Sequence, residues 1–216
     1  SVDAAADADA DAPDAFDAAI AAAPTADPLT ALPAATLVGA EAWALAAPAL
    51  VQFVELFERW NQRINLSAAR SLDDIAQHVV DSLALLPHVG EAASLVDVGS
   101  GGGFPLIVLG ACRPTISLRG VEPIHKKTAF LSTAVRELRL ANVEIVTRRV
   151  DPDVDRGFDV ATSRATFALD EWLALGQQLV RGGGRVLGME AREQVALGPN
   201  DERHPYAAGD RQRDFR

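Results

Sequence analysis

The densest group of glycines in the chain follows a short apolar run that contains one acidic residue. Residues 95–105 have the sequence LVDVGSGGGFP, so an apolar strand is expected to run into a turn that holds Gly99, Gly101 and Gly103. Such a loop lets backbone approach a ligand closely, and a helix expected to open at Pro105 would aim its first N–H groups at the same place. Alone, the pattern fits a nucleotide-like ligand or a plain tight turn.

Two carboxylates narrow the choice of ligand. Asp97 lies two residues before Gly99, where it would repel the pyrophosphate of a dinucleotide but could attract a cationic amino-acid moiety or its water shell. Glu122 lies 23 residues after Gly99, at the end of the next expected strand, where an acid can accept hydrogen bonds from both ribose hydroxyls of an adenosine. Together they favour S-adenosylmethionine over NAD.

Later strand ends supply further candidates. The third expected strand ends in Arg149-Val150-Asp151, where a main-chain N–H, the valine side chain and the carboxylate could flank an adenine. A solvated turn acid is the alternative interpretation of Asp151. Arg164 follows the fourth strand, where a guanidinium would be costly unless it met a carboxylate or phosphate. The methionine carboxylate of the cofactor and an RNA phosphate are both candidate partners for it.

These residues need a parallel sheet to bring them together, and the apolar pattern predicts one. Five strands are expected, at residues 94–98, 117–121, 143–146, 158–162 and 185–189. Helices are expected between them, at residues 105–112, 125–140 and 169–180. Strands that alternate with helices imply right-handed crossovers and a doubly wound, mostly parallel α/β sheet of the Rossmann-like kind.

Two amphipathic helices are expected before the sheet. The first carries apolar residues at three- and four-residue spacing from Leu50 to Ile64 and ends near Asn65. The second spans residues 72–87, with Ser71 as its N-cap. We therefore divide the chain into an arm (1–36), an N-terminal helical segment (37–90) and a Rossmann-like domain (91–216).

Charge and composition bound the function. The chain of 216 residues has a net charge of -10, but residues 1–50 hold 8 of its 30 acidic residues and neither Lys nor Arg. The rest carries 22 acids against 20 bases, a net charge of -2 that leaves room for a local basic face. Residues 1–36 are rich in Ala, Asp and Pro, a composition typical of a disordered acidic arm.

Several classes of function are not expected. A single cysteine, Cys112, cannot form an internal disulfide or a cysteine-based zinc site, and the histidines lack the spacing of metal ligands. No apolar run approaches the roughly 18 residues that a membrane span needs. We expect a cytoplasmic protein with no metal and no membrane contact, and nothing implies an oligomer.

Five motifs, in order and at the family's spacing, carry a resemblance to a known family. They are WN with INLS (60–61, 64–67), HVVDSL (78–83), DVGSGGGFP (97–105), KK ahead of FL (126–127, 130–131) and SRA (163–165). Over about residues 56–191 the chain resembles the bacterial small-subunit rRNA guanine-N7 methyltransferases, also called glucose-inhibited division protein B. The resemblance implies a class I S-adenosylmethionine-dependent fold, with 16S rRNA or the 30S subunit as partner. It also implies cofactor contacts at Gly99, Phe104, Val150, Asp151 and Arg164.

The reaction implied by the resemblance needs no general base. Guanine N7 has a free lone pair and no proton to lose, so methyl transfer requires alignment and electrostatic stabilisation. We therefore expect no catalytic triad, and the candidate substrate contacts are Asn65, His78, Asp81, Lys126, Arg149 and Arg164. His78 and Asp81, which share a helix face, could instead brace the sheet domain. Seven cations are expected around one side of the sheet, where they could bind phosphates: Lys126, Lys127, Arg136, Arg139, Arg148, Arg149 and Arg164.

The chain departs from the family pattern at two places. Leu106 stands where the family usually has Gly, and Met189-Glu190-Ala191 stands where it usually has Leu-Lys-Gly. These departures leave two alternatives open: a non-catalytic paralogue that binds cofactor and RNA or the ribosome, and a methyltransferase for a small molecule. After residue 191 only 25 residues remain, so we also expect the closing strand pair of the sheet to be shortened or partly missing.

Overall fold

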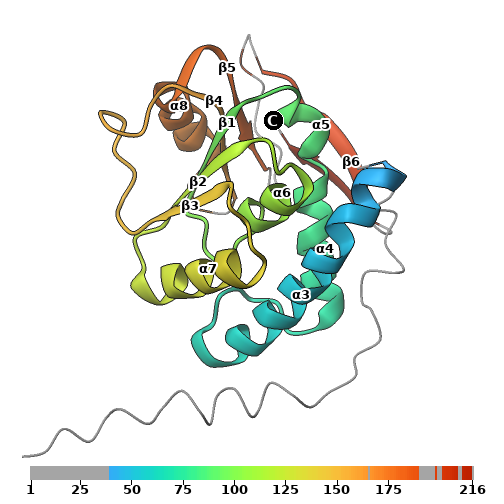
Figure 1. Cartoon of the computed structure of the whole chain (residues 1–216). Coiled ribbons are helices and arrows are strands. Elements are labelled where there is room, and N and C mark those ends of the chain that lie inside the picture. The colour runs from blue at the N-terminus through green and yellow to red at the C-terminus, as the bar shows by residue number, and fades with distance from the viewer. Residues whose placement is uncertain (1–38, 165, 190–197, 199–200, 209–210, 216) are drawn as a thin grey trace, which may run out of the picture.

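The described part of the chain begins with helices that lie beside a parallel sheet. A computed structural model describes residues 39–164, 166–189, 198, 201–208 and 211–215, and the expected arm at 1–36 lies outside them. Figure 1 shows the first three described helices, α3 (Ala40–Ile64), α4 (Leu72–Leu83) and α5 (Leu86–Val89), to one side of the strands.

The sheet has five strands in the order β3-β2-β1-β4-β5, and every neighbouring pair is parallel. Their bounds are β1 (Ser94–Val98), β2 (Ser117–Val121), β3 (Val143–Val146), β4 (Phe158–Ser163) and β5 (Val180–Gly188). The order reverses between β1 and β4, and ligands of such sheets bind at the carboxyl ends of strands beside this reversal. The predicted doubly wound α/β fold is confirmed.

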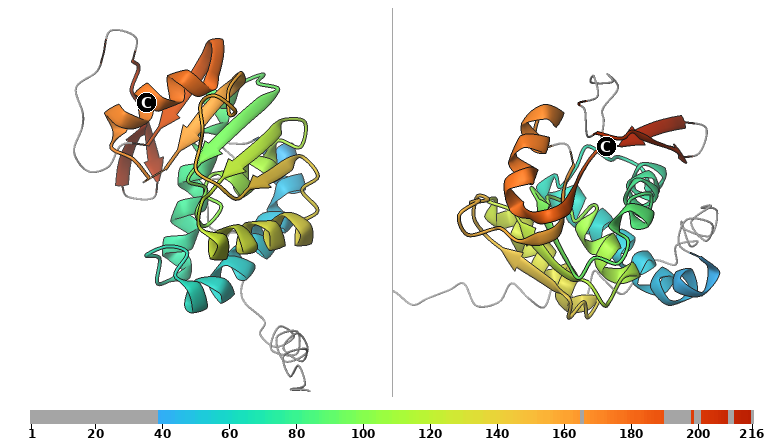
Figure 2. Two further views of the ribbon diagram at one scale, coloured as in Figure 1. Left: turned by 90° about the vertical axis from the view of Figure 1, so that its left-hand side faces the viewer. Right: turned by 90° about the horizontal axis from the view of Figure 1, so that it is seen from above.

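Three helices alternate with these strands: α6 (Leu106–Cys112), α7 (His125–Glu137) and α8 (Leu169–Leu179). Apolar residues on the two faces of β1 belong to different clusters, because side chains of a strand alternate between faces. Leu95 joins the cluster formed with α3, α4, α6 and α7, whereas Val96 joins the smaller cluster formed with α8. Figure 2 shows the sheet between these two sets of helices.

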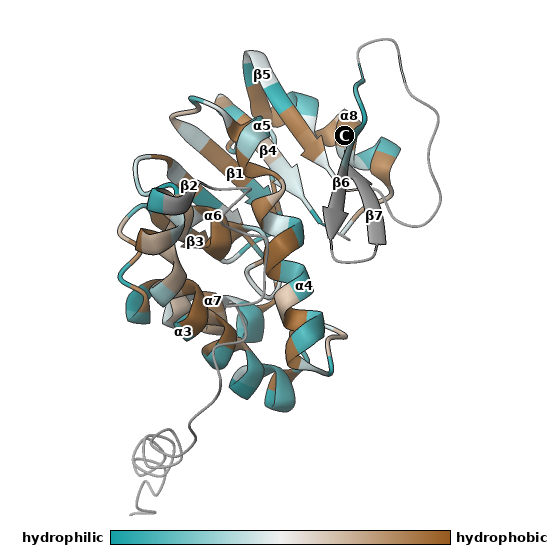
Figure 3. Cartoon of the chain, turned by 90° about the vertical axis from the view of Figure 1, so that its right-hand side faces the viewer, coloured by the Kyte–Doolittle hydropathy of each residue, from teal (hydrophilic) through white to brown (hydrophobic). Residues whose placement is uncertain are grey.

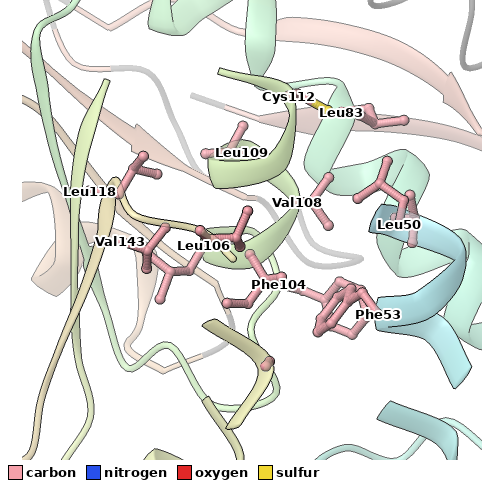
Figure 4. Packing of buried hydrophobic residues seen from close by; sticks show 14 of the residues in the cluster. Leu50, Phe53, Leu83, Phe104, Leu106, Val108, Leu109, Cys112, Leu118 and Val143 are labelled. Carbon is pink, nitrogen blue, oxygen red and sulfur yellow. The ribbon is translucent and has the colours of Figure 1, made fainter. Parts of the chain in front are cut away.

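The larger cluster joins the N-terminal helices to the sheet domain in one core. Leu50 and Phe53 of α3 and Leu83 of α4 lie with Phe104 and Leu106 in the close-up of Figure 4. Figure 3 shows α6 as almost wholly hydrophobic, whereas α4 also carries hydrophilic residues. The helices before residue 90 therefore fix the glycine loop from one side.

Helix bounds differ from the expectation where capping and tertiary packing decide them. α3 begins ten residues before Leu50 and ends where Asn65 adopts a left-handed backbone conformation (φ 52°). Ser71 caps α4 as expected, since its Oγ accepts from Asp74 N (3.1 Å) while Asp74 Oδ2 accepts from Ser71 N (3.1 Å). The helix expected over 72–87 is two helices, α4 and the short α5.

The chain closes with the hairpin β6 (His204–Ala208) and β7 (Arg211–Phe215), the dark red arrows of Figure 2. We expected this pair to be shortened or partly missing, and the second alternative is wrong, because both strands are present with five residues each in antiparallel register. The pair nevertheless forms a sheet of its own, and within the described residues no strand pairs with the outer edge of β5. The described helices include none long and apolar enough to cross a membrane.

Candidate functional site

The glycine loop joins β1 to α6 and bends through three left-handed residues. Gly99, Gly101 and Gly103 have φ angles of 73°, 52° and 83°, a region that side chains strain. Gly99 N donates to Val121 O of β2 (2.8 Å), which holds the loop over the carboxyl end of the sheet. Helix α6 begins at Leu106, so Pro105 caps the helix instead of opening it as expected.

Asp97 is buried beneath this loop with no protein partner for its side chain. It is 1% exposed, and among the described residues neither carboxylate oxygen has a hydrogen-bond partner. Burial raises the pKa of Asp97 to about 7, against the opposing effects of the Ser100 hydroxyl and the Arg164 guanidinium. Thr162, its register partner on β4, likewise has a buried hydroxyl without a partner in this part of the chain. Two such groups side by side indicate a place for a polar ligand.

Glu122, at the end of β2, closes the loop from the other side. Its Oε2 accepts from Gly101 N (2.9 Å) and its Oε1 accepts from Ile124 N (2.9 Å), and the residue is 3% exposed. Each carboxylate oxygen has a second lone pair, so the side chain can still accept from a ligand. Glu122 therefore shapes the loop in addition to any contact with ribose hydroxyls.

Two residues that the sequence did not single out as cofactor contacts border the same loop. A Cβ placed on Gly101 would lie 4.0 Å from Lys127 Nζ, so the ammonium at the start of α7 adjoins the loop. Thr166, in the segment between β4 and α8, covers Gly99 so closely that a Cβ there would lie 2.3 Å from Thr166 Oγ1. The available signals were the Lys126-Lys127 pair and the position of Thr166 two residues after Arg164.

The loop after β3 carries Val150 and the exposed Asp151, and a buried acid at its far end holds it in place. Asp155 Oδ2 accepts from Asp151 N (3.0 Å), and Arg148 donates to both Asp155 oxygens (2.5 and 2.6 Å). These cationic and backbone donors hold the pKa of Asp155 below its usual value despite its burial. Asp151 Oδ1 accepts from Asp153 N (3.0 Å), so this carboxylate stabilises its own turn.

Arg164, His78 and Asp81 meet although 86 residues separate the first two. Arg164 Nη1 lies 3.1 Å from His78 Nδ1 and 3.9 Å from Asp81 Oδ2, and its guanidinium lies 5.3 Å from the centre of the Phe104 ring. A guanidinium can only donate, so His78 Nδ1 accepts and its Nε2 carries the proton. We expected the cofactor carboxylate or an RNA phosphate as partner for Arg164, and the structure adds a third group, the carboxylate of Asp81, which is 2% exposed.

Phe104 contributes its ring to packing. The ring centre lies 5.0 Å from those of Phe53 and Phe57 and 5.3 Å from that of His78. Only its main chain is left to face the glycine loop. The aromatic face of α3 thus supports Phe104, which follows directly after Gly103 of the loop.

The remaining candidate substrate contacts lie on or near α7, after β3 and after α3, and the basic face expected for the seven cations stays a prediction. Lys126 is exposed at the start of α7, and Arg149 is exposed directly after β3. Asn65 lines a pocket of about 310 Å³ with Asn61, and its neighbour Leu66 would contact a Cβ on Gly102. Arg136 lies near the other end of α7, about 15 Å from Lys126 at 1.5 Å per residue, and Arg139 follows the helix.

Comparison with known proteins identifies the family. The family profile described as rRNA small subunit methyltransferase G matches residues 46–202. The protein named "Ribosomal RNA small subunit methyltransferase G" of Neisseria meningitidis serogroup B is 39% identical over 156 residues, which cover 70% of this chain and 75% of that protein. Its namesake in Laribacter hongkongensis is 43% identical over 166 residues, 73% of this chain and 80% of that protein. The chain belongs to the rRNA small subunit methyltransferase G family.

The solved structures agree with this membership at the level of the fold. Cofactor-bound Rv0187 from MTB aligns with a TM-score of 0.54 at 18% identity, over 78% of this chain and 87% of that one. The family membership confirms the expected methyltransferase activity with S-adenosylmethionine as the methyl donor.

The residues of this family member fit that cofactor. Asp97 offers a buried carboxylate without a protein partner among the described residues, which suits a cationic amino group, and the loop at Gly101 carries no side chain that would keep a ligand from its backbone. By contrast, the described residues hold no cluster of three or more side chains that could bind a metal ion.

The departure at Leu106 is accommodated by packing. Leu106 is fully buried, and a Cβ on Gly120 would lie only 2.3 Å from its Cδ2. The missing side chain of Gly120 on β2 therefore makes room for the leucine, and the loop geometry survives the change. The other departure falls at Glu190 and Ala191, which lie outside the described residues.

Proposed function

We propose that this chain transfers the methyl group of S-adenosylmethionine to N7 of a guanine in 16S rRNA, guanine 527 in the usual bacterial numbering. The 30S subunit or its rRNA is then the partner, and in a bacterial cell that substrate would place the protein in the cytoplasm. The names of its relatives support an rRNA substrate. The observation that carries the proposal is that residues suited to the cofactor and residues suited to RNA lie next to each other at the carboxyl edge of the sheet.

The first set binds the cofactor. We assign it to Asp97, Gly99, Gly101, Gly103 and the main chain of Phe104, with Glu122 for the ribose and Val150 and Asp151 for the adenine. When bound, the cofactor supplies an electrophilic methyl group on a sulfonium. The buried Asp97 would hold the positive amino group, and the side-chain-free glycine loop would let backbone N–H groups approach.

The second set lies beside the loop and faces the substrate. Arg164 joins β4 to α4 through His78 and Asp81, and Lys126 and Lys127 begin α7 at the same edge. These cations suit phosphates, and Asn65 and Arg149 extend the surface on either side. Because guanine N7 loses no proton, this arrangement needs no general base: the chain must hold the base in line and stabilise its positive charge.

Incubation with labelled S-adenosylmethionine and 30S subunits, and separately with naked 16S rRNA, tests the proposal. Label at N7 of a guanine in 16S rRNA is the expected result. Cofactor binding by calorimetry without transfer to either RNA would instead support a non-catalytic paralogue. Transfer to a small acceptor but not to RNA would support the third alternative.

A further inference from the structure

One exposed aromatic ring adjoins the cofactor loop and has no role in the site described above. Among the described residues, the large hydrophobic side chains that are exposed are Leu45, Ile124, Val154 and Phe167, and Phe167 alone is aromatic. Its exposed fraction is 37%. A single exposed apolar side chain is ordinary on a protein surface, and what distinguishes Phe167 is where the residue lies and how its ring is held.

Phe167 lies beside the glycine loop. Thr166, the preceding residue, lies against Gly99, with Thr166 Oγ1 3.4 Å from Gly99 O. Consecutive Cα atoms are about 3.8 Å apart, so Phe167 stands one residue from the contact that covers the loop. The same segment begins with Arg164, which carries the link to His78.

The ring of Phe167 is held in a fixed orientation. It stacks on Trp172 of α8, with ring centres 5.9 Å apart and planes inclined by 18°. Trp172 is itself 2% exposed, and its Nε1 donates to Leu187 O of β5 (2.9 Å). One face of Phe167 therefore rests on a side chain that the sheet locks in place, which makes the ring a preorganised platform.

We propose that Phe167 is the platform on which the target guanine stacks during methyl transfer, an inference that rests on the proposed function. The lone pair of N7 lies in the plane of the base, so the N7 edge must face the methyl donor, which leaves both faces of the base free to be held by stacking. Proteins hold unstacked RNA bases by aromatic rings or guanidinium planes. Phe104 and Trp172 are buried, and Arg164 already lies over the Phe104 ring, so Phe167 is the accessible plane among these residues.

Substitution at Phe167 tests this role as a substrate-positioning residue. With 30S subunits and saturating S-adenosylmethionine, Phe167→Ala and Phe167→Leu should lower kcat/KM by roughly 10-fold to 100-fold, the range that loss of one base–aromatic stack predicts. Phe167→Tyr keeps the ring and should remain within about 3-fold of wild type. The dissociation constant for S-adenosylmethionine, measured by calorimetry, should change by less than about 2-fold in all three variants.

The leucine variant separates stacking from mere packing. Leucine still covers Trp172 with apolar surface but has no flat face, so a rate equal to wild type for Phe167→Leu would overturn the inference. An equal loss of cofactor affinity would also overturn it, since Phe167 would then support the cofactor pocket. Leu45→Ala, at an exposed hydrophobic residue of α3, is the matched control and should leave all constants unchanged. If wild type itself methylates no RNA, the proposed function fails instead.

Discussion

His78 and Arg164 are joined by one hydrogen bond that spans two layers of the fold. His78 Nδ1 on α4 lies 3.1 Å from Arg164 Nη1 beyond β4, and both the His78 ring and the Arg164 guanidinium lie 5.3 Å from the centre of the Phe104 ring. The N-terminal helices are thereby tied to the cofactor edge of the sheet. A change at either residue should alter methyl transfer without unfolding the protein.

Arg164→Lys should lower kcat/KM for 30S methylation by roughly 10-fold. A lysine has no planar fork, so it cannot bond His78 while covering Phe104 and facing a phosphate. Initial rates with labelled cofactor measure the effect. Arg136→Lys, at an exposed arginine at the far end of α7, is the control, and equal rates for wild type and Arg164→Lys would count against the role of Arg164.

Gly101→Val should abolish measurable cofactor binding in calorimetry. The added Cβ would lie in ordinary contact with Gly99 O (3.6 Å) and Lys127 Nζ (4.0 Å), so the protein tolerates it, and the two further methyl groups of valine would extend into the proposed ligand site. The residue also has a φ of 52°, which a valine strains, so Gly183→Val (φ 79°, with nothing within 4 Å of its Cβ) controls for strain alone. Retained affinity in a folded Gly101→Val protein would show that the pocket is wrongly assigned.

The free energy of unfolding of the cofactor-free protein should depend on pH because of Asp97. Burial raises the pKa of Asp97 to about 7 from 3.8, so the folded state binds this proton more tightly than the unfolded state. The corresponding stability is fully present below pH 4 and is lost as the pH rises through 7, at no more than about 1.4 kcal/mol per pH unit. Denaturant unfolding of wild type and Asp97→Asn from pH 4 to 8 measures the difference between them, and a difference independent of pH would contradict the assignment.

Asp155→Asn should destabilise the protein and weaken adenine binding together. The change removes the charge-assisted bonds from Arg148 and loosens the N–H of Asp151, at a cost of about 2–3 kcal/mol. Urea unfolding gives the stability, and calorimetry with S-adenosylhomocysteine gives the affinity. Glu144→Gln is the control, because its exposed ion pair with Arg119 should contribute less than about 1 kcal/mol. Unchanged affinity in Asp155→Asn would separate this acid from the cofactor site.

Amide hydrogen exchange should distinguish the closing hairpin from the main sheet. The β6–β7 ladder should protect its amides less than β1, because an isolated pair of strands is marginal in stability. Exchange across Arg203 to Phe215 as slow as that of Leu95 to Val98 would mean that the hairpin is stabilised as part of the main sheet.

Local patterns were sufficient to predict the main sheet. The apolar runs at β1 to β4 and the glycine loop are set by neighbouring residues, so their ends were predicted to within one residue. β5 begins at Val180 instead of 185, because a register shift opposite Phe158 and Val160 extends its pairing through three glycines. Glycines lack the apolar side chains by which a strand is predicted from sequence, so this part of β5 can be assigned only from its pairing with β4.

The site residues that follow directly from the ends of strands could be predicted from the sequence. The contacts between side chains from different parts of the fold could not. Asp97 and Glu122 follow from strand and spacing. Other contacts depend on the tertiary fold. Thr166 covers Gly99, and Arg164 pairs with Asp81, although each pair is far apart in the sequence. Asp155 holds its loop by accepting from the N–H of Asp151. A single sequence shows each of these residues but not the contact between them.

Glu122 couples two properties that evolution would otherwise adjust separately. The carboxylate proposed to recognise the ribose is also the one that fixes Gly101 and Ile124. A descendant that replaced it to accept a different nucleoside would at the same time release the glycine loop at Gly101. A change of nucleoside preference at Glu122 would therefore also require new acceptors for the N–H groups of Gly101 and Ile124, so the choice of cofactor and the shape of the loop must change together.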